Sequence, residues 1–261
     1  MNDVLKELMA MRRADAAARE AEVPLVGLER LAIDAPSPQR FMPAFRRAGI
    51  NVIAELKRAS PSEGLIREDF NPPELALELE GAGAAALSVL CEPHRFLGGE
   101  AYLREARAVS SLPILYKDFI STRYQIAEAR LAGASAALLI AAALDDASLK
   151  ELLEYAHDMD LEALVETHNE EEIDRAVGAG ARMVGVNCRN LRNFKCDVSL
   201  LSSLIGKIPQ GCVRIAESGM HSHEAILEAK AAGADGFLVG TALMRAADPG
   251  AKLLELTGAN T

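Results

Sequence analysis

Residues 52–64, VIAELKRASPSEG, carry the pattern that decides the fold. The apolar run 52–54, continued at Leu56, is typical of a buried strand. Glu55 and Lys57 are two residues apart, so in an extended strand both side chains leave the same face. Because a buried parallel strand is almost continuously apolar, an acid and a base at its carboxyl end indicate a cavity that receives both charges. The alternative is an ion pair that only closes one end of the fold.

Strand-like and helix-like segments alternate along the rest of the chain. The eight strand candidates are Val52–Leu56, Ala84–Leu90, Pro113–Lys117, Ala136–Ala142, Glu162–Glu166, Met183–Asn187, Val213–Glu217 and Gly236–Gly240. The seven helical stretches between them are Pro73–Ala82, Glu100–Val109, Thr122–Ala132, Asp146–Met159, Glu170–Ala179, Ser199–Ile205 and Ser222–Ala232. This alternation predicts an α/β fold, a single (β/α)8 TIM barrel, and the alternative is a doubly wound open sheet. We expect residues 1–261 to form one barrel domain, with residues 1–50 as an N-terminal helical extension.

An internal repeat supports the barrel. A Gly-Ala pair followed by an apolar run occurs at Gly83-Ala84, Gly133-Ala134, Gly180-Ala181 and Gly233-Ala234. Glycine adopts the left-handed conformation that ends many helices, so each pair is expected to end a helix and lead into a strand. The four pairs precede the second, fourth, sixth and eighth strand candidates, which is the spacing of one βαβα unit used four times.

The first fifty residues are expected to cover one end of the barrel. Residues 2–20 have a helical pattern with one apolar face, formed by Leu5, Leu8 and Met9. Prolines at positions 24, 36, 38 and 43 then predict a loop with at most short helices. Phe41 and Phe45 are four residues apart, so one helical turn would place both rings on the core.

Composition narrows the classes of partner. The formal net charge is -10, and nucleic acids and anionic membranes require basic surfaces, so we expect neither as a partner. The four cysteines, Cys91, Cys188, Cys196 and Cys212, show neither a C-x-x-C pair nor zinc spacing, which predicts reduced thiols. The start lacks a secretory apolar core, and the longest apolar stretch, Ala136–Leu144, is too short to span a bilayer. We therefore expect a cytoplasmic protein, and the acidic exterior is compatible with a monomer.

Charged residues follow the predicted strands, where barrel enzymes place their chemistry. The strand ends supply three cations and three acids: Lys57, Lys117, Arg189, Glu55, Glu166 and Glu217. We expect the crowded site to lower the pKa of a lysine and raise that of a glutamate, giving a general acid and a general base near neutral pH. Asp118 should point away from this mouth and orient a helix.

The last two strand candidates end in small residues. Ser218-Gly219 and Gly240-Thr241 would expose backbone N–H groups, and a short helix beginning at Thr241 would point its N-terminus at the same place. This arrangement binds phosphate, although ordinary turns also use glycine. Together with the mixed charges, it predicts proton transfer on a phosphorylated, sugar-like substrate.

At these positions the sequence closely resembles the indole-3-glycerol phosphate synthase family. The similar stretches are IAELKRASPSEG, LSVLCEPHRFLGG, PILYKDFI, ALLIAAAL, ALVETH, VGVNCRNL, AESGM and FLVGTALMRAADPG. They include all eight strand ends, from about Val52 to Pro249. The family converts a carboxyphenylamino-deoxyribulose phosphate into indole-3-glycerol phosphate, with release of carbon dioxide and water, in tryptophan biosynthesis. The resemblance implies this activity, with no cofactor and no metal.

The resemblance also implies roles for individual residues. Lys117 would be the general acid for ring closure, Glu166 would transfer protons during dehydration, and Lys57 would hold anions and protonate the leaving hydroxyl. The implied catalytic residues are Lys117, Glu166, Lys57, Glu55, Asn187, Arg189 and Ser218. The implied substrate-binding residues are Ser60, Pro61, Phe96, Phe119, Leu138, Glu217 and Leu238. The implied phosphate-binding residues are Lys57, Ser218, Gly219, Gly240 and Thr241.

Two departures from the family pattern are small. Thr241 stands where serine is commoner, and Cys188 stands where a polar residue is usual and is expected to point outward. The loop Arg58–Asn71 is expected to close over the substrate ring. A barrel like phosphoribosylanthranilate isomerase and a non-catalytic phosphate-binding barrel are the alternative functions.

Overall fold

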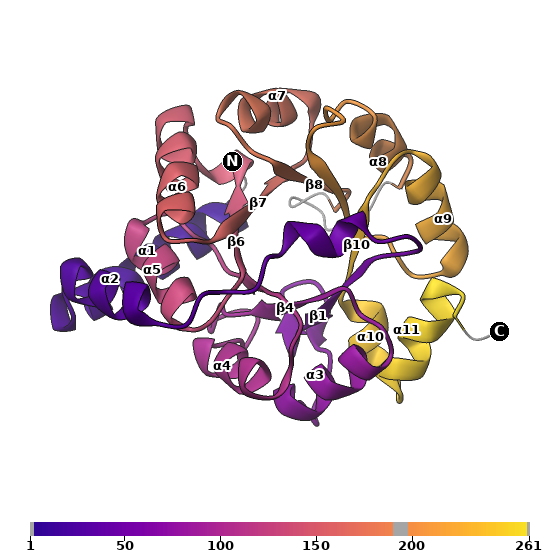
Figure 1. The fold of residues 1–261 in the computed structure, drawn as a ribbon, viewed down its shortest axis with the longest axis horizontal. Helices are drawn as coiled ribbons and strands as arrows, with labels where there is room; N and C mark the ends of the chain where they lie inside the picture. The colour runs from indigo at the N-terminus through magenta and orange to yellow at the C-terminus, as the bar shows by residue number, and fades with distance from the viewer. Residues whose placement is uncertain (1–2, 190–197, 260–261) are drawn as a thin grey trace.

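Eight parallel strands close into a barrel in this computed structural model, which describes residues 3–189 and 198–259 (Figure 1). The strands are β1 Val52–Leu56, β4 Ala86–Leu90, β5 Ile114–Lys117, β6 Ala136–Ile140, β7 Glu162–Thr167, β8 Met183–Asn187, β9 Val213–Glu217 and β10 Gly236–Val239. Each strand pairs with its neighbours in the chain, and β1 pairs with both β4 and β10. The barrel prediction is confirmed, and the doubly wound alternative is wrong.

All seven predicted helices occur, each within one residue of its expected bounds. They are α3 Pro72–Gly81, α4 Glu100–Val109, α5 Arg123–Leu131, α6 Asp146–Asp158, α7 Glu170–Gly178, α8 Val198–Ile205 and α9 His223–Ala231. The last two helices are α10 Thr241–Arg245 and α11 Pro249–Thr257. The fourth barrel strand, β6, is shorter than predicted because its last residues form the 3-10 turn η2, Ala141–Ala143.

The four Gly-Ala pairs share one helix ending. The four glycines have φ values between 88° and 107°, in the left-handed region. At the first pair, Gly83 N–H donates to Glu80 O and Ala84 N–H to Leu79 O, and the other three pairs repeat this pattern. These two bonds define a Schellman motif, which satisfies the last carbonyls of the helix. The second strand therefore begins two residues later than predicted, because Ala84 still belongs to this ending.

A further helix uses the same ending without glycine. At the end of α6, Asp160 has φ 58° and its N–H donates to His157 O, while Leu161 N–H donates to Ala156 O. Aspartate tolerates the left-handed conformation better than most residues, although less well than glycine. The sequence pattern did not reveal this Schellman motif because the marker glycine is absent.

The N-terminal edge of the barrel is closed by the turn η1, Met42–Arg46, which crosses in front of the strands in Figure 1. Phe41 and Phe45 are buried with their ring centroids 5.2 Å apart, and Phe45 lies against the first residue of β10. The Met42 N–H donates to Glu162 Oε2 at the start of β7. The prediction that this segment covers one end is confirmed.

Two helices precede η1: α1 Asp3–Glu22 and α2 Leu25–Asp34. The buried face of α1 contains Leu5 and Leu8, as predicted. The prediction of only short helices after Pro24 missed α2, which has ten residues and packs against α5. Pro24 stands immediately before the first helical residue, where the missing N–H of proline breaks no helical hydrogen bond.

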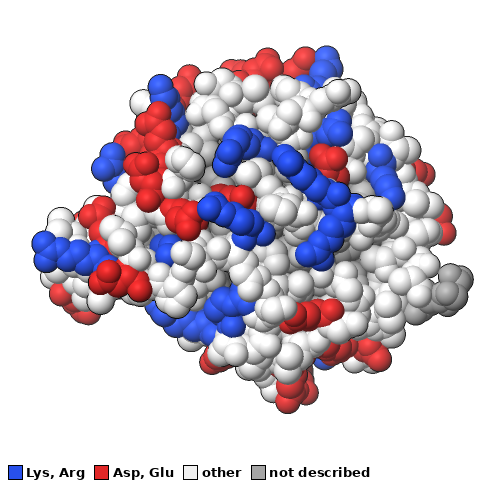
Figure 2. All heavy atoms as spheres, in the orientation of Figure 1, with Lys and Arg blue, Asp and Glu red and all other residues white. Residues whose placement is uncertain are grey.

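Basic side chains gather on the face that η1 covers. Figure 2 shows Lys and Arg across the middle of this face and Asp and Glu mainly toward its rim. Exposed basic residues along this edge are Arg46, Arg47, Arg182 and Lys230. The net negative charge is therefore unevenly distributed, and the expectation that no nucleic acid or membrane binds stays a prediction. In the described part of the chain, no helix has the length and apolar character needed to cross a membrane.

Candidate active site

A cavity of about 140 Å³ lies at the carboxyl ends of the strands. Every predicted site residue except Gly219 and Gly240 lines it, and those two line a smaller hollow beside it. Glu55 and Lys57 both face the cavity, as their spacing on one strand predicts. The six charged residues that the sequence singled out therefore meet in one place.

Lys117 lies at the centre of the charged cluster. Its Nζ is 3.1 Å from Glu217 Oε2 and 3.3 Å from Glu166 Oε2. A second pair stands beside it, with Lys57 Nζ 2.8 Å from Glu55 Oε2. Glu55 and Lys57 thus form the ion pair that the alternative predicts, but both residues line the cavity and do not close the barrel end.

Two glycines make room for the carboxylates. A Cβ on Gly185 would lie 2.1 Å from Glu217 Oε1, and a Cβ on Gly240 would lie 2.1 Å from Glu55 Oε2. Real Cβ atoms do not approach other atoms so closely, so any larger residue would displace the carboxylate. The lack of a side chain at Gly185 and at Gly240 therefore helps to set the positions of the Glu217 and Glu55 carboxylates.

The expected sign of the lysine pKa shift is wrong. Burial lowers the pKa of Lys117, but the carboxylates of Glu217, Glu166 and Glu55 raise it by a larger amount. The pKa of Lys117 therefore lies well above its usual value. The prediction assumed that neighbouring cations would dominate. Acids instead surround this ammonium group, so it stays charged at neutral pH.

The carboxylates around Lys117 differ in proton affinity. Burial raises the pKa of Glu217, the Lys117 charge lowers it, and the nearby Glu166 carboxylate raises it. Together these effects bring the pKa of Glu217 to about 7. Burial also raises the pKa of Glu166 and of Glu55, but lysine charges outweigh burial and bring both below the usual value. The prediction of a raised glutamate pKa is confirmed for Glu217 alone of the three. Two neighbouring acids, one readily protonated and one ionised, can serve as acid and base.

The smaller hollow has the features of an anion site. Ser218 and Gly219 have φ values of 68° and 78°, so two consecutive residues are left-handed. Strain of this kind in a non-glycine residue is typical of functional sites. Thr241 begins the short helix α10, as predicted, and the first N–H groups of a helix have no partner within it. Lys57 and Arg189 line the same hollow and supply positive charge.

Apolar side chains line the cavity together with the charged residues. The rings of Phe96 and Phe119 are 5.9 Å apart at their centroids, and Leu138, Leu238 and Pro61 also line the cavity, as predicted. The predicted site residues do not include Leu5, Ser62, Leu90, Asp118 and Ile140, which also line the cavity. The two strand residues could have been found from the alternation within their strands, but nothing local indicates that Leu5 reaches the site.

The loop after β1 folds into a small hairpin over the mouth. Its strands are β2 Ala59–Ser60 and β3 Gly64–Leu65, and Ser60 lines the cavity. The Ala59 N–H donates to Phe96 O at 3.2 Å, and Arg67 Nη1 donates to Ala246 O at 3.0 Å. These bonds hold the hairpin beside the cavity, and its closure over a substrate stays a prediction.

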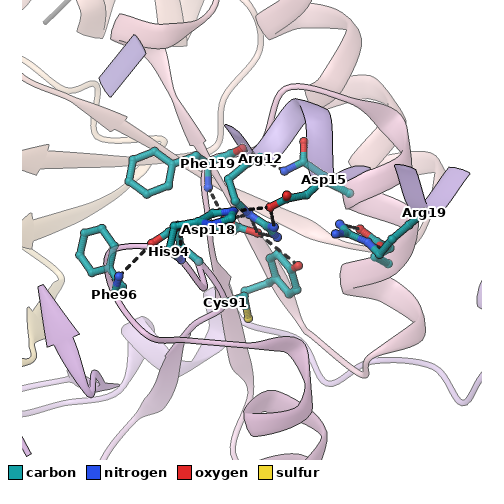
Figure 3. A network of polar contacts seen from close by, with 12 residues as sticks. Arg12, Asp15, Arg19, Cys91, His94, Phe96, Asp118 and Phe119 are labelled. Carbon is teal, nitrogen blue, oxygen red and sulfur yellow. Dashed lines mark hydrogen bonds and ion pairs between the residues drawn. The ribbon is translucent and has the colours of Figure 1, made fainter. Parts of the chain in front are cut away.

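A buried ion pair joins the N-terminal helix to the site (Figure 3). Arg12 of α1 contacts Asp118, with its Nε 2.9 Å from Oδ1 and its Nη2 2.5 Å from Oδ2. Asp118 Oδ1 also accepts the N–H of Phe119 at 2.8 Å. Asp118 follows Lys117 directly, so α1 fixes the strand end that carries the central lysine. Asp118 contacts a helix, as predicted, but it also lines the cavity, so the prediction that it points away from the mouth is wrong.

Comparisons with known proteins identify the family. The family model for indole-3-glycerol phosphate synthase matches residues 5–256. The chain belongs to the indole-3-glycerol phosphate synthase family. It is 45% identical over 258 residues to the indole-3-glycerol phosphate synthase of Mycolicibacterium gilvum, covering 99% of this chain and 95% of that protein. It is 44% identical over 257 residues to the synthase of Sulfurimonas denitrificans, covering 97% and 98%.

Solved structures from other families share the fold. A tryptophan synthase α-subunit mutant from Pyrococcus furiosus superposes with a TM-score of 0.60 at 18% identity, over 80% of this chain and 98% of that chain. The N-acetylmannosamine-6-phosphate 2-epimerase of Clostridium perfringens superposes with a TM-score of 0.62 at 18% identity, over 80% and 93%. At this identity the likeness shows the barrel fold and no more.

Cys188, one of the two departures from the family pattern, forms a disulfide bond that was not expected. Cys188 lies outside both cavity linings, which agrees with an outward side chain, and it is buried. It is disulfide-bonded, whereas Cys91 and Cys212 are free. The prediction of reduced thiols is therefore wrong for Cys188, because the lack of a C-x-x-C pair does not exclude bonds between cysteines farther apart. Cys196 lies outside the described residues.

No metal site accompanies the cluster. Within residues 3–189 and 198–259, no group of three or more His, Cys, Asp or Glu side chains is arranged to hold a metal ion.

Proposed function

We propose that the chain is an indole-3-glycerol phosphate synthase, a carboxy-lyase of tryptophan biosynthesis. Its substrate would be carboxyphenylamino-deoxyribulose 5-phosphate, and its products indole-3-glycerol phosphate, carbon dioxide and water. The observation that carries the proposal is Lys117, held between Glu166 and Glu217 in a cavity with an adjoining anion site, in a chain that the family model matches over residues 5–256.

Ring closure would use the Lys117 ammonium group. The aromatic carbon that bears the carboxylate attacks the substrate carbonyl, a carbon–carbon bond forms, and negative charge develops on the carbonyl oxygen. A charged donor placed there stabilises this charge and supplies the proton for the new hydroxyl group. The raised pKa keeps the Lys117 donor protonated before each turnover. Loss of carbon dioxide then returns the bonding electrons to the ring and restores its aromaticity.

Dehydration would need one acid and one base. Lys57 would protonate the new hydroxyl, which leaves as water, while Glu166 takes the proton released from the adjacent carbon. The lowered pKa of Glu166 keeps it ionised as a base. Glu55, which is 2.8 Å from Lys57 in the structure, would hold that lysine in place and bind a sugar hydroxyl with Asn187.

Substrate binding would fix both ends of the molecule. The phosphate would bind at Ser218, Gly219, Gly240 and Thr241, and the aromatic ring would lie against Phe96 and Phe119. Ser60 of the hairpin and Arg189 would border the substrate from the rim. Two fixed ends bring the reacting carbons together, which is worth several orders of magnitude in rate.

The direct test is to add the proposed substrate and follow the appearance of indole fluorescence. We expect turnover by the purified chain without added metal or cofactor. A chain that leaves this substrate unchanged but isomerises phosphoribosylanthranilate would contradict the proposal and favour the isomerase alternative. A chain that binds the substrate without changing it would favour the phosphate-binding alternative.

We also propose that the chain acts as a cytoplasmic monomer that binds only small molecules. The cavity described here is formed within one chain, so catalysis requires no second copy. Light scattering after size exclusion measures the mass directly, and a mass of twice 27.9 kDa would contradict the monomer.

A further inference from the structure

A partly buried imidazole stands beside the candidate base. His168 follows Glu166 by two residues at the end of β7, and its side chain is 16% exposed. Its Nε2 is 3.5 Å from Glu166 Oε1, while Glu166 Oε2 faces Lys117 Nζ at 3.3 Å. The two oxygens of this carboxylate therefore face two different nitrogen groups.

The other side of the imidazole is held by the first turn of α7. Glu172 Oε2 is 3.2 Å from His168 Nδ1 and accepts the His168 backbone N–H at 2.8 Å. Glu172 Oε1 accepts a bond from Asn169 Nδ2 at 2.8 Å, so the carboxylate is fixed at both oxygens. An ionised carboxylate accepts but does not donate, so Nδ1 carries the proton shared with Glu172.

The geometry then decides the state of Nε2. This atom is buried without a hydrogen-bond partner among the described residues, and the nearest carboxylate is Glu166. A bare lone pair would face the negative oxygen and repel it, whereas a protonated nitrogen attracts it. Both ring nitrogens therefore favour protonation, which makes the ring an imidazolium.

We propose that His168 is a positioning residue for Glu166. As an imidazolium anchored by Glu172, it holds the Glu166 carboxylate ionised and turned toward the reaction. This inference rests on the proposed function, since it assigns His168 a task in the work of Glu166. It differs from the roles above because His168 lies outside the cavity lining and would not touch the substrate.

The charges around the ring agree with this assignment. Burial lowers the pKa of His168, but the hydrogen bond to Glu172 and the charges of Glu166, Glu172 and Glu217 raise it above its usual value. In return His168 and Lys117 both lower the pKa of Glu166. Glu217 carries the raised pKa instead. His168 thus adds to the effect of Lys117 in keeping Glu166 ionised.

The first test measures catalysis in His168→Asn. We expect kcat to fall about ten- to hundredfold, because the carboxylate loses its orientation, with little change in KM. We also expect the acidic limb of the kcat/KM profile to move up by about one pH unit, because Glu166 loses a neighbouring cation. His157→Asn, on the exposed side of α6, is the matched control and should change neither quantity. An unshifted acidic limb in His168→Asn would overturn the proposal.

The second test does not depend on activity. NMR of the imidazole nitrogens should show His168 protonated at both atoms above pH 6.5, the usual pKa of the group. Its titration should move to lower pH in Glu166→Gln. Titration of His168 at or below its usual value, or no change in Glu166→Gln, would refute the assignment. Should His168→Asn fail to fold, Glu172→Gln replaces it in the kinetic test with the same expected direction.

The two tests also separate this proposal from the proposed function. A wild-type chain without synthase turnover would contradict the proposed function, and the NMR titration would still decide whether His168 acts on Glu166. If the wild-type chain has synthase turnover but His168→Asn does not shift the acidic limb of the kcat/KM profile, only the proposal for His168 is contradicted.

Discussion

Lys117 shows how neighbours set the chemistry of one side chain. A buried lysine usually loses its proton more easily, yet three carboxylates reverse that effect here. The ammonium group is therefore protonated and can donate hydrogen bonds to developing negative charge. Its role depends on where it lies, because it does not lose its proton easily.

The first prediction at this scale is that Lys117→Ala abolishes turnover while the fold survives. Removal of a charged donor from a developing oxyanion costs about two to three orders of magnitude in kcat, and loss of the proton source adds to this. Fluorescence kinetics and circular dichroism together measure both outcomes. Normal activity in a folded Lys117→Ala protein would remove the proton-donor role.

A second prediction concerns the space beside Glu217. In Gly185→Ala the new Cβ would lie 2.1 Å from Glu217 Oε1, so the carboxylate must move away from Lys117. We expect kcat to fall at least tenfold while the protein stays folded. Gly178→Ala is the control, because a Cβ there meets nothing within 4 Å. Equal activities of the two variants would show that the Glu217 position is unimportant.

A third prediction concerns the anion site. Ser218→Asp would place a carboxylate beside the proposed phosphate, and like charges repel, so we expect KM to rise at least tenfold. Ser218→Ala keeps the backbone N–H and should have a much smaller effect. Unchanged affinity in Ser218→Asp would place the phosphate elsewhere.

The positions of these residues were predictable, but their electrostatics were not. The rule that barrel chemistry lies at strand ends brought Glu55, Lys117 and Glu217 together from the sequence alone. The pKa directions depend on distances of about 3 Å between side chains from separate strands, and no local pattern encodes these distances. For the same reason no local pattern indicates that Gly185 shapes the site.

At the scale of elements, the end of α6 offers a test of stability. Asp160 holds a left-handed conformation that costs a non-glycine residue about 1 kcal/mol. We expect Asp160→Gly to stabilise the protein by about 0.5–1 kcal/mol, since the exposed ion pair with Arg40 contributes little. Urea denaturation measures the change. A loss of stability would show that the Asp160 side chain matters more than its backbone conformation.

The attachment of α1 to β5 gives a prediction of the opposite sign. Arg12→Met leaves the buried Asp118 carboxylate without its cation, and breaking such a pair costs about 3–5 kcal/mol. We expect lower kcat as well, because Asp118 adjoins Lys117 and binds the Phe119 N–H. Arg13→Met, on the exposed side of the same helix, should be nearly neutral. Equal stabilities of the two variants would contradict a structural role for the Arg12 contact.

Most elements were predictable because the repeat marks their ends. Gly83 and its three counterparts end helices by a backbone conformation that the sequence reveals directly. The helix α2 was missed because Pro24 was interpreted as a breaker, although proline also favours helix starts. The contact of Leu5 with the cavity was missed because it depends on where the whole of α1 packs.

For the whole molecule, the shifted carboxylates predict how stability depends on pH. Glu217 has a folded pKa of about 7, above the usual 4.5, so its contribution is present below pH 4.5 and is lost as pH rises to 7. Glu166 and Glu55 have lowered values and contribute in the opposite sense, losing stability as pH falls below 4.5. We expect Glu217→Gln to gain stability relative to wild type between pH 4.5 and 7, by about 1–3 kcal/mol. A constant difference across this window would contradict the raised pKa.

The basic residues beside η1 lie at the N-terminal edge of the barrel, and the cavity lies at the carboxyl edge. An immobilised preparation would exploit this separation. Beads that carry sulfonate groups should bind the exposed basic residues Arg46, Arg47, Arg182 and Lys230. The cavity would then face away from the bead, toward the solution. Random coupling through surface lysines gives no such orientation, so capture on beads of this kind should preserve more activity per attached molecule.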